Sequence, residues 1–283
     1  MDPNRRRFDE AREAIDGADA LIVTAGAGMG VDSGLPDFRG DEGFWRAYPP
    51  MKHLGLSFVD MANPRLFATD PRFAWGFYGH RLGLYRRTAP HAGFSILRAW
   101  AEGKRAGAFV FTSNVDGAFQ RAGFDPERVV ECHGAIDFLQ CVKPCSNDIF
   151  GADGFEPDID ESTFRARGEL PTCPRCGALA RPNILMFGDG TWLPQRTDEQ
   201  ERRFSAFCRD LERTRAKVVV VECGAGTAIP TVRSTSEAVA RELSGTLVRI
   251  NLREPMVRDA RVRALTFALG ARAALEEIAS PGT

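Results

Sequence analysis

The chain has 283 residues, with 37 Lys and Arg against 38 Asp and Glu, and a formal net charge of −1. This near balance argues against a nucleic-acid binder that relies on neutralising phosphates. With 43% hydrophobic and 27% charged residues, the composition is typical of a soluble globular protein rather than a disordered one. No apolar run approaches the roughly 18 residues of a membrane span. Because the charged N-terminus also lacks the apolar segment of a secretory signal, we expect a cytoplasmic protein that does not bind membranes.

Six short apolar runs, each ending at a glycine or a polar residue, predict buried parallel strands. They cover residues 20–24, 108–112, 128–132, 184–187, 217–223 and 247–251. Stretches long enough for helices lie between most of them, including 95–102, 199–215 and 231–243. Strands that alternate with helices predict an α/β fold with a doubly wound parallel sheet.

The residues that directly follow these runs are candidates for a binding site, because ligands of doubly wound sheets bind beyond the carboxyl ends of the strands. They are glycines and hydrogen-bonding residues: Gly26, Ala27 and Gly28; Ser113, Asn114, Val115 and Asp116; His133 and Gly134; Gly188 and Asp189; Gly224, Ala225 and Gly226; and Asn251. Each taken singly is well explained as a turn residue. The six groups together predict one shared crevice.

The glycine loop after the first run predicts a nucleotide site. Close-set glycines at Gly26, Gly28 and Gly30 let backbone N–H groups approach a pyrophosphate, and Arg39 adds a charge-assisted contact. The G-x-G-x-x-G fingerprint of hydride-transfer enzymes fails, because Val31 occupies the place of the third glycine. We therefore expect a dinucleotide that is bound differently from that of a dehydrogenase.

Two cysteine pairs predict a metal site in the segment 137–179. The pairs are C-x3-C at Cys141 and Cys145 and C-x2-C at Cys173 and Cys176. Four thiolates hold Zn²⁺ tetrahedrally in a closed site that is structural rather than catalytic. Free buried thiols are the alternative.

Several motifs, in this order, resemble those of the sirtuins, the family of NAD-dependent protein deacylases. They are the glycine loop with S-G-L-P-D-F-R-G, T-S-N-V-D from Thr112, H-G at His133, the two cysteine pairs, R-P-N-I-L-M-F-G-D from Arg181, the glycine loop at Gly224, and I-N at Ile250. The resemblance implies a Rossmann-like NAD-binding domain and a small zinc-binding module, with NAD and an acyl-lysine peptide entering the cleft between them. We assign residues 1–40, 88–136 and 180–283 to the first, 137–179 to the second, and 41–87 to an aromatic-rich helical insertion.

The resemblance also implies the roles of individual residues in releasing nicotinamide and moving the acyl group from lysine to ADP-ribose. His133 would be the general base, and its unperturbed pKa near 6.5 suits proton uptake at cellular pH. Asn114 would position the ribose and its attacking water, and Asp116 would receive the nicotinamide carboxamide. Phe187 and Gly188 would pair with the substrate peptide as an added strand. The other cofactor-binding positions would be Gly26, Ala27, Gly28, Asp37, Phe38, Arg39, Ser113, Gly224, Ala225, Gly226 and Asn251.

Four departures from the family's pattern leave the acceptor of the reaction open. Ser113 stands in place of glutamine, Ala135 in place of serine, the loop Gly224 to Thr227 in place of G-T-S, and Asp189 in place of the glutamate of F-G-E. None of them removes His133 or Asp116, so we expect NAD chemistry to survive. A protein-lysine deacylase is the leading hypothesis, and the alternatives are a protein mono-ADP-ribosyltransferase and a non-catalytic NAD-sensing module.

Tyr78 and Arg81 have the Y-x-x-R spacing that resembles the acid-reading pair of desuccinylase-type sirtuins. A guanidinium pairs with a carboxylate through two hydrogen bonds, and helical i, i+3 spacing places both side chains on one face. The alternative is that Arg81 is a solvated surface residue in an arginine-rich stretch with Arg86 and Arg87. The sequence does not specify the acyl preference, the physiological acceptor or the oligomeric state.

Overall fold

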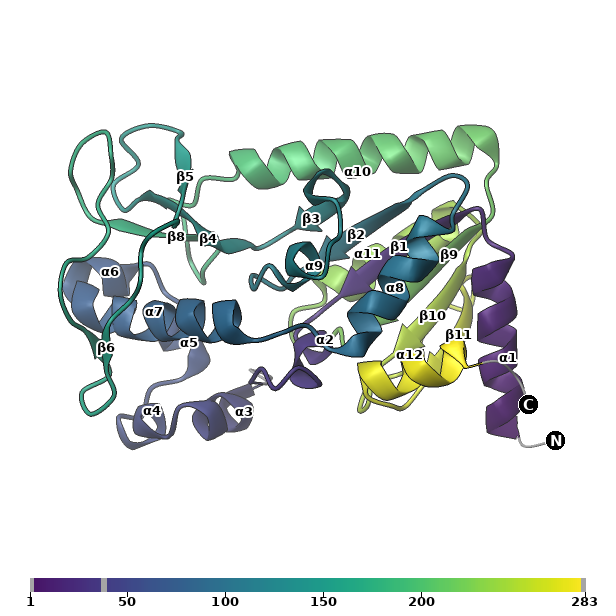
Figure 1. Ribbon diagram of the computed structural model, residues 1–283, viewed down its shortest axis with the longest axis horizontal. Coiled ribbons are helices and arrows are strands. Elements are labelled where there is room, and N and C mark those ends of the chain that lie inside the picture. The colour runs from purple at the N-terminus through teal and green to yellow at the C-terminus, as the bar shows by residue number, and fades with distance from the viewer. Residues whose placement is uncertain (1–2, 37–39, 281–283) are drawn as a thin grey trace.

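The computed structural model describes residues 3–36 and 40–280. A six-stranded sheet and the helices that cover it form one half of the molecule (Figure 1). All neighbouring strands are parallel, in the order β11-β10-β9-β1-β2-β3. The central strands β1 and β9 are buried along their whole length, as expected for apolar runs covered on both faces. The bounds are β1 Ala20–Ala25, β2 Ala108–Thr112, β3 Val129–Glu131, β9 Val218–Cys223, β10 Thr246–Ile250 and β11 Arg263–Phe267.

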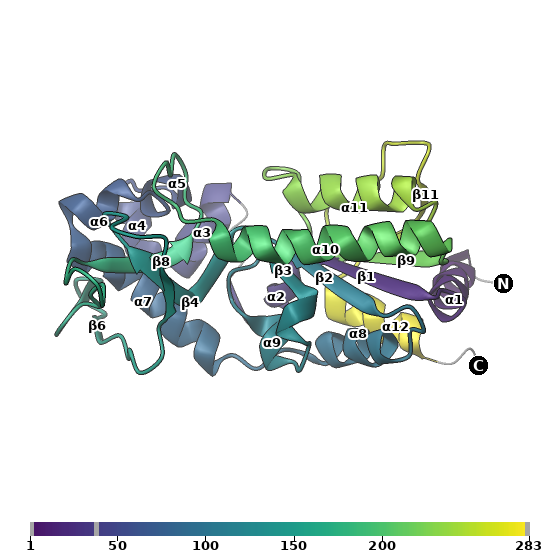
Figure 2. The ribbon, with the colours of Figure 1, turned by 90° about the horizontal axis from the view of Figure 1, so that it is seen from above.

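Helices cover both faces of this sheet, which confirms the doubly wound α/β fold (Figure 2). Apolar side chains of α1 (Pro3–Asp16), α8 (Ala92–Glu102) and α12 (Ala271–Ala279) form one core with the strands. Those of α10 (Gln195–Thr214) and α11 (Thr231–Glu242) form a second core on the opposite face. Among the described residues, no helix has both the length and the apolar character needed to cross a membrane.

A second part of the molecule combines a bundle of helices with a small antiparallel sheet of order β5-β4-β8. Its longest helix, α7, is tied to the sheet because Trp75 Nε1 donates a hydrogen bond of 3.0 Å to the carbonyl of Ala180. A Cβ on Gly76 would lie 2.1 Å from the carbonyl oxygen of Phe164, so only glycine lets α7 pack this closely. The elements are α3 Gly40–Ala47, α4 Pro49–His53, α5 Phe58–Met61, α6 Arg65–Thr69, α7 Pro71–Arg87, β4 Gly134–Cys141, β5 Ile149–Gly151, β6 Ile159–Asp160, β7 Arg165–Ala166 and β8 Ala180–Ile184. Three short elements lie beside the main sheet: α2 Gly28–Val31, α9 Ala118–Arg121 and the 3-10 turn Pro126–Arg128.

Five of the six predicted strands are confirmed to within a residue or two, and the sixth is wrong. The run 184–187 is not a strand of the parallel sheet, because β8 ends at Ile184 and pairs antiparallel with β4. Ile184 and Met186 pack instead in the aromatic core of the helical part. A short apolar run does not reveal which core it joins.

Candidate functional site

A cavity of about 770 Å³ lies beyond the carboxyl ends of the strands, between the parallel sheet and the helical part. Its volume suits a ligand larger than a single small metabolite. The predicted residues that line it are Gly26, Ala27, Ser113, Asn114, Val115, Asp116, His133, Phe187, Gly188, Asp189, Ala225, Gly226, Tyr78 and Arg81. Gly28, Gly224 and Asn251 do not line the cavity but adjoin or bond to residues that do. Asp37, Phe38 and Arg39 lie outside the described residues.

The two glycine loops that follow β1 and β9 are packed directly against each other. The N–H of Gly28 donates to the carbonyl of Gly224 at 3.0 Å, and that of Gly26 donates to Cys223 at 3.0 Å. Gly224 has a φ of +66°, and a Cβ there would lie 2.4 Å from the carbonyl carbon of Gly28. Glycine is therefore required where the loops meet, and the backbone of Ala27 and Gly226 lines the cavity.

Asn251 supports the second glycine loop rather than the cavity itself. Its Nδ2 donates to the carbonyl of Ala225 at 2.6 Å, and its Oδ1 accepts the N–H groups of Arg253 and Glu254. The side chain is 1% exposed, so these bonds are made in the interior. Asn251 thus ties the loop after β10 to the loop after β9.

Asn114 is held at the end of β2 with its amide in a fixed orientation. Its Nδ2 donates to the carbonyl of Gly26 at 3.1 Å, and its backbone N–H donates to Thr112 Oγ1 at 3.0 Å. Among the described residues, Asn114 Oδ1 accepts no hydrogen bond. The fixed amide therefore presents an acceptor to whatever enters the cavity.

Asp116 is a buried carboxyl group in the cavity wall, 6% exposed. Burial raises its pKa, against the opposing effect of the Ala118 N–H, which donates to Asp116 Oδ1 at 2.9 Å. The second carboxyl oxygen, Oδ2, accepts no hydrogen bond among the described residues. Such a group suits recognition of an amide donor rather than simple charge neutralisation.

His133 lies two residues beyond the end of β3 and lines the same cavity. Burial lowers its pKa, and a hydrogen bond with the backbone of Ser113 opposes that effect. The strand end before it is fixed by α10, since Glu131 N–H donates to Gln200 Oε1 at 3.0 Å and Thr197 Oγ1 donates to the Glu131 carbonyl at 3.1 Å. The imidazole is therefore neutral at cellular pH and able to accept a proton.

Arg81 is buried in the cavity wall, 5% exposed, which rules out the surface interpretation. Its Nε and Nη2 donate to the hydroxyl of Tyr85 at 3.0 and 2.8 Å. The guanidinium carbon lies 5.6 Å from the ring centroid of Tyr78 and 5.4 Å from that of Tyr85. The Tyr78 hydroxyl is buried and has no hydrogen-bond partner among the described residues. Sequence reasoning missed Tyr85, although its i+4 spacing from Arg81 was a signal that would have found it.

The four predicted metal ligands come together with the spacing that zinc requires. A tetrahedron of sulfurs about 2.3 Å from Zn²⁺ has edges of about 3.8 Å. Cys141 Sγ lies 3.7 Å from Cys176 Sγ, Cys145 Sγ lies 3.7 Å from Cys173 Sγ, and all four lie within 4.8 Å of one another. Backbone N–H groups of Cys176 and Arg175 lower the pKa of Cys173 to about 7, which favours its thiolate form. The cluster fits a closed, structural zinc site and leaves no position for chemistry.

Known proteins share both this sequence pattern and this architecture. Residues 26–209 match the model of the Sir2 family. The NAD-dependent protein deacylase of Thermococcus kodakarensis is 31% identical over 237 residues, which are 82% of this chain and 79% of that protein. A match to the NAD-dependent protein deacylase of Aquifex aeolicus, also 31% identical, covers 60% of this chain and 62% of that protein. A solved Sir2 homologue in complex with NAD has a TM-score of 0.67 at 25% identity, covering 95% of this chain and 91% of that one.

Proposed function

The chain belongs to the Sir2 family, and from this premise we propose that it is an NAD-dependent protein deacylase in which His133, Asn114 and Asp116 carry the reaction. The enzyme consumes NAD, releases nicotinamide and moves an acyl group from a lysine side chain to ADP-ribose. The observation that carries the proposal is the convergence of these three side chains on one cavity that two glycine loops border. A protein that only binds a nucleotide does not need an acceptor amide, a buried carboxyl group and a neutral imidazole together.

NAD supplies the nicotinamide–ribose bond that is broken and the ribose hydroxyl that receives the acyl group. In the proposed mechanism, Asp116 binds the nicotinamide carboxamide through its buried carboxyl group. Asn114 Oδ1 orients the ribose and the water used later, because its amide is fixed by Gly26. His133 accepts a proton at its unprotonated ring nitrogen, because its lowered pKa keeps the imidazole neutral before the reaction.

The phosphate-bearing part of NAD is assigned to the backbone around the two glycine loops. Ala27, Ala225 and Gly226 line the cavity there, and Gly28 and Gly224 keep the loops in contact. Backbone N–H groups free of a bulky side chain suit a pyrophosphate. Asp37, Phe38 and Arg39 remain predicted members of this part of the site, as does Ser113, whose backbone contacts His133.

The acyl-lysine peptide is assigned to the opposite rim, beside Phe187 and Gly188. Gly188 is exposed at the cavity, and the N–H of Phe187 donates to the carbonyl of Ala62 at 2.9 Å. An extended peptide added at this edge would direct its acyl-lysine toward His133.

A more specific proposal concerns the acyl group: we infer that it ends in a carboxylate. The supporting observation is that Arg81 lies inside the cavity wall and is held by Tyr85, with the hydroxyl of Tyr78 beside it. A preset guanidinium loses little entropy on binding a carboxylate. Succinyl- and pentanoyl-lysine peptides of one sequence differ mainly in that charge. We expect the succinyl peptide to be preferred and Arg81→Met to remove the preference, whereas equal turnover of acetyl and succinyl peptides by the unaltered enzyme would exclude this proposal.

Mass spectrometry after incubation with NAD and a mixed set of acyl-lysine peptides tests the whole proposal. Deacylation yields O-acyl-ADP-ribose and a peptide lighter by the acyl mass. Mass added to the peptide or to the enzyme itself would instead indicate mono-ADP-ribosylation. No nicotinamide release, together with NAD binding that survives His133→Ala, would indicate a non-catalytic binding module.

A further inference from the structure

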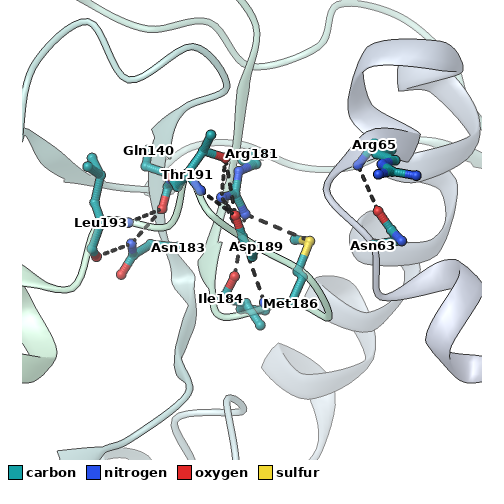
Figure 3. Close-up of polar contacts among 10 residues, drawn as sticks. All are labelled: Asn63, Arg65, Gln140, Arg181, Asn183, Ile184, Met186, Asp189, Thr191 and Leu193. Atoms are coloured by element: carbon teal, nitrogen blue, oxygen red, sulfur yellow. Dashed lines mark hydrogen bonds and ion pairs between the residues drawn. The ribbon is translucent and has the colours of Figure 1, made fainter.

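A fully buried ion pair between Arg181 and Asp189 joins β8 to the loop 185–190, which borders the cavity (Figure 3). Arg181 Nη2 and Asp189 Oδ2 are 2.8 Å apart, and both side chains are 0% exposed. Asp189 stands where the family's pattern has glutamate, so the shorter side chain here makes the contact. Neither residue has a role in the mechanism described above.

The pair holds both ends of the loop at once. On one side, Arg181 Nη1 donates to the carbonyl of Ile184 at 3.4 Å, and the N–H of Met186 donates to Asp189 Oδ2 at 3.4 Å. On the other side, both the N–H and the Oγ1 hydroxyl of Thr191 donate to Asp189 Oδ1 at 3.1 Å. The carboxylate therefore accepts from four donors, and the loop between them turns at Gly188, where φ is +66°.

The same loop is connected to the general base and to the helical part. The N–H of Leu185 donates to the carbonyl of His133 at 3.0 Å, and that of Phe187 donates to Ala62 of the segment after α5 at 2.9 Å. Residues 184–189 also line the cavity. A change in the shape of this loop would thus alter the peptide edge and reach the backbone of His133.

We propose that Arg181 and Asp189 are positioning residues that hold the loop 185–188 in the shape that receives the substrate peptide. This inference rests on the proposed deacylase function. The pair acts through geometry, because a buried ion pair contributes little net stability over an apolar pair of the same volume, while its hydrogen bonds fix direction. The guanidinium and the carboxylate together make the loop one rigid unit with β8.

Asp189→Asn tests the proposal, because it keeps the shape of the side chain and replaces one acceptor by a donor. That donor would face Arg181 Nη2 and the N–H of either Met186 or Thr191, so the loop cannot keep all its bonds. We expect the KM for an acyl-lysine peptide to rise at least about tenfold, while the Kd for NAD changes less than about twofold. Asp189→Glu, which restores the charge, should bring the peptide KM back to within about threefold of the unaltered enzyme. The matched control is Asp148→Asn, which removes an exposed partner of Arg175 at 3.8 Å and should change neither value.

A role in stability alone would lower the melting temperature and the amount of active enzyme without changing the peptide KM. An unchanged peptide KM in folded Asp189→Asn therefore overturns the proposal, and so does a parallel loss of NAD affinity. If Asp189→Asn does not fold, Thr191→Val decides, because it removes the hydroxyl that donates to Asp189 Oδ1 and accepts from Arg181 Nη2, and keeps the ion pair: a peptide KM raised about threefold supports the proposal, and an unchanged one overturns it. If the unaltered enzyme deacylates no peptide, the proposed function has failed rather than this inference.

Discussion

Gly224→Ala should separate the two glycine loops and weaken NAD binding. A non-glycine residue at the φ of +66° costs about 1–2 kcal/mol. The added Cβ would also lie 2.4 Å from the backbone nitrogen of Met29 and 2.6 Å from Gly28 Cα, well inside contact distance. Relieving that clash moves one loop away from the other and loses the 3.0 Å hydrogen bond from Gly28 to Gly224, worth about 1 kcal/mol. The free energy of unfolding should therefore fall by about 2–3 kcal/mol.

Gly154→Ala is the control that separates the cost of a non-glycine residue at positive φ from the cost of the Cβ clash in Gly224→Ala. Gly154 has a φ of +73°, but a Cβ there would meet nothing within 4 Å. Urea unfolding should show a loss of only about 1–2 kcal/mol for this variant. Calorimetry should show unchanged NAD affinity for Gly154→Ala and at least about tenfold weaker binding for Gly224→Ala. If the two variants lose the same stability and both bind NAD normally, the close packing of the loops is not what forms the nucleotide site.

Three further predictions concern the base, the metal and the core. Because burial lowers the pKa of His133, the acidic limb of the pH profile of kcat/KM should have its midpoint below 6.5, and a midpoint above 6.5 would contradict this. The pH profile of the residual activity of His133→Ala should lack this limb. The same group makes folding less favourable as the pH falls below 6.5, since the unfolded chain then binds the proton more readily. Metal analysis should find one zinc per chain, and Cys176→Ser should lose it and lower the melting temperature; full metal content in that variant would exclude the site. Arg249→Met should destabilise the fold by about 3–5 kcal/mol, because it leaves the fully buried carboxylate of Glu222 without its cation, and adding Glu222→Gln should recover part of that loss in the same urea assay; no recovery would mean that lost packing dominates.

The central strands were predictable because each of them is a run of consecutive apolar residues. The valines of 218–221 are apolar without interruption, a pattern typical of a strand covered on both faces. The edge strand β11, Arg263–Phe267, was missed because an edge strand is half exposed and its residues mix charged and apolar types. The run 184–187 was misplaced for a related reason, since its apolar residues face a core built from helices far away in the sequence.

The site was predictable where it depends on strand ends, and less so where it depends on helix faces. Residues after parallel strands meet at one edge of any such sheet, so the order of the motifs was enough to bring Asn114 and His133 together. The burial of Arg81 could not be inferred in this way. Arg81 can be buried in the cavity wall because Tyr85 accepts its hydrogen bonds and three aromatic rings surround it. That environment exists only once the helix is packed.

Two paired strands connect the cysteine cluster to the backbone beside His133. β4 begins at Gly134, directly after His133, and ends at the zinc ligand Cys141. Its partner β8 pairs Ala180 with Cys141 at the metal end and Ile184 with Gly134 at the cavity end. At that second end a Cβ on Gly134 would lie 2.0 Å from the carbonyl oxygen of Asn183, so only glycine lets the two strands approach this closely. Zinc held by the four cysteines would therefore fix one end of the ladder whose other end sets the backbone of His133, the proposed base, and the start of the loop 185–188.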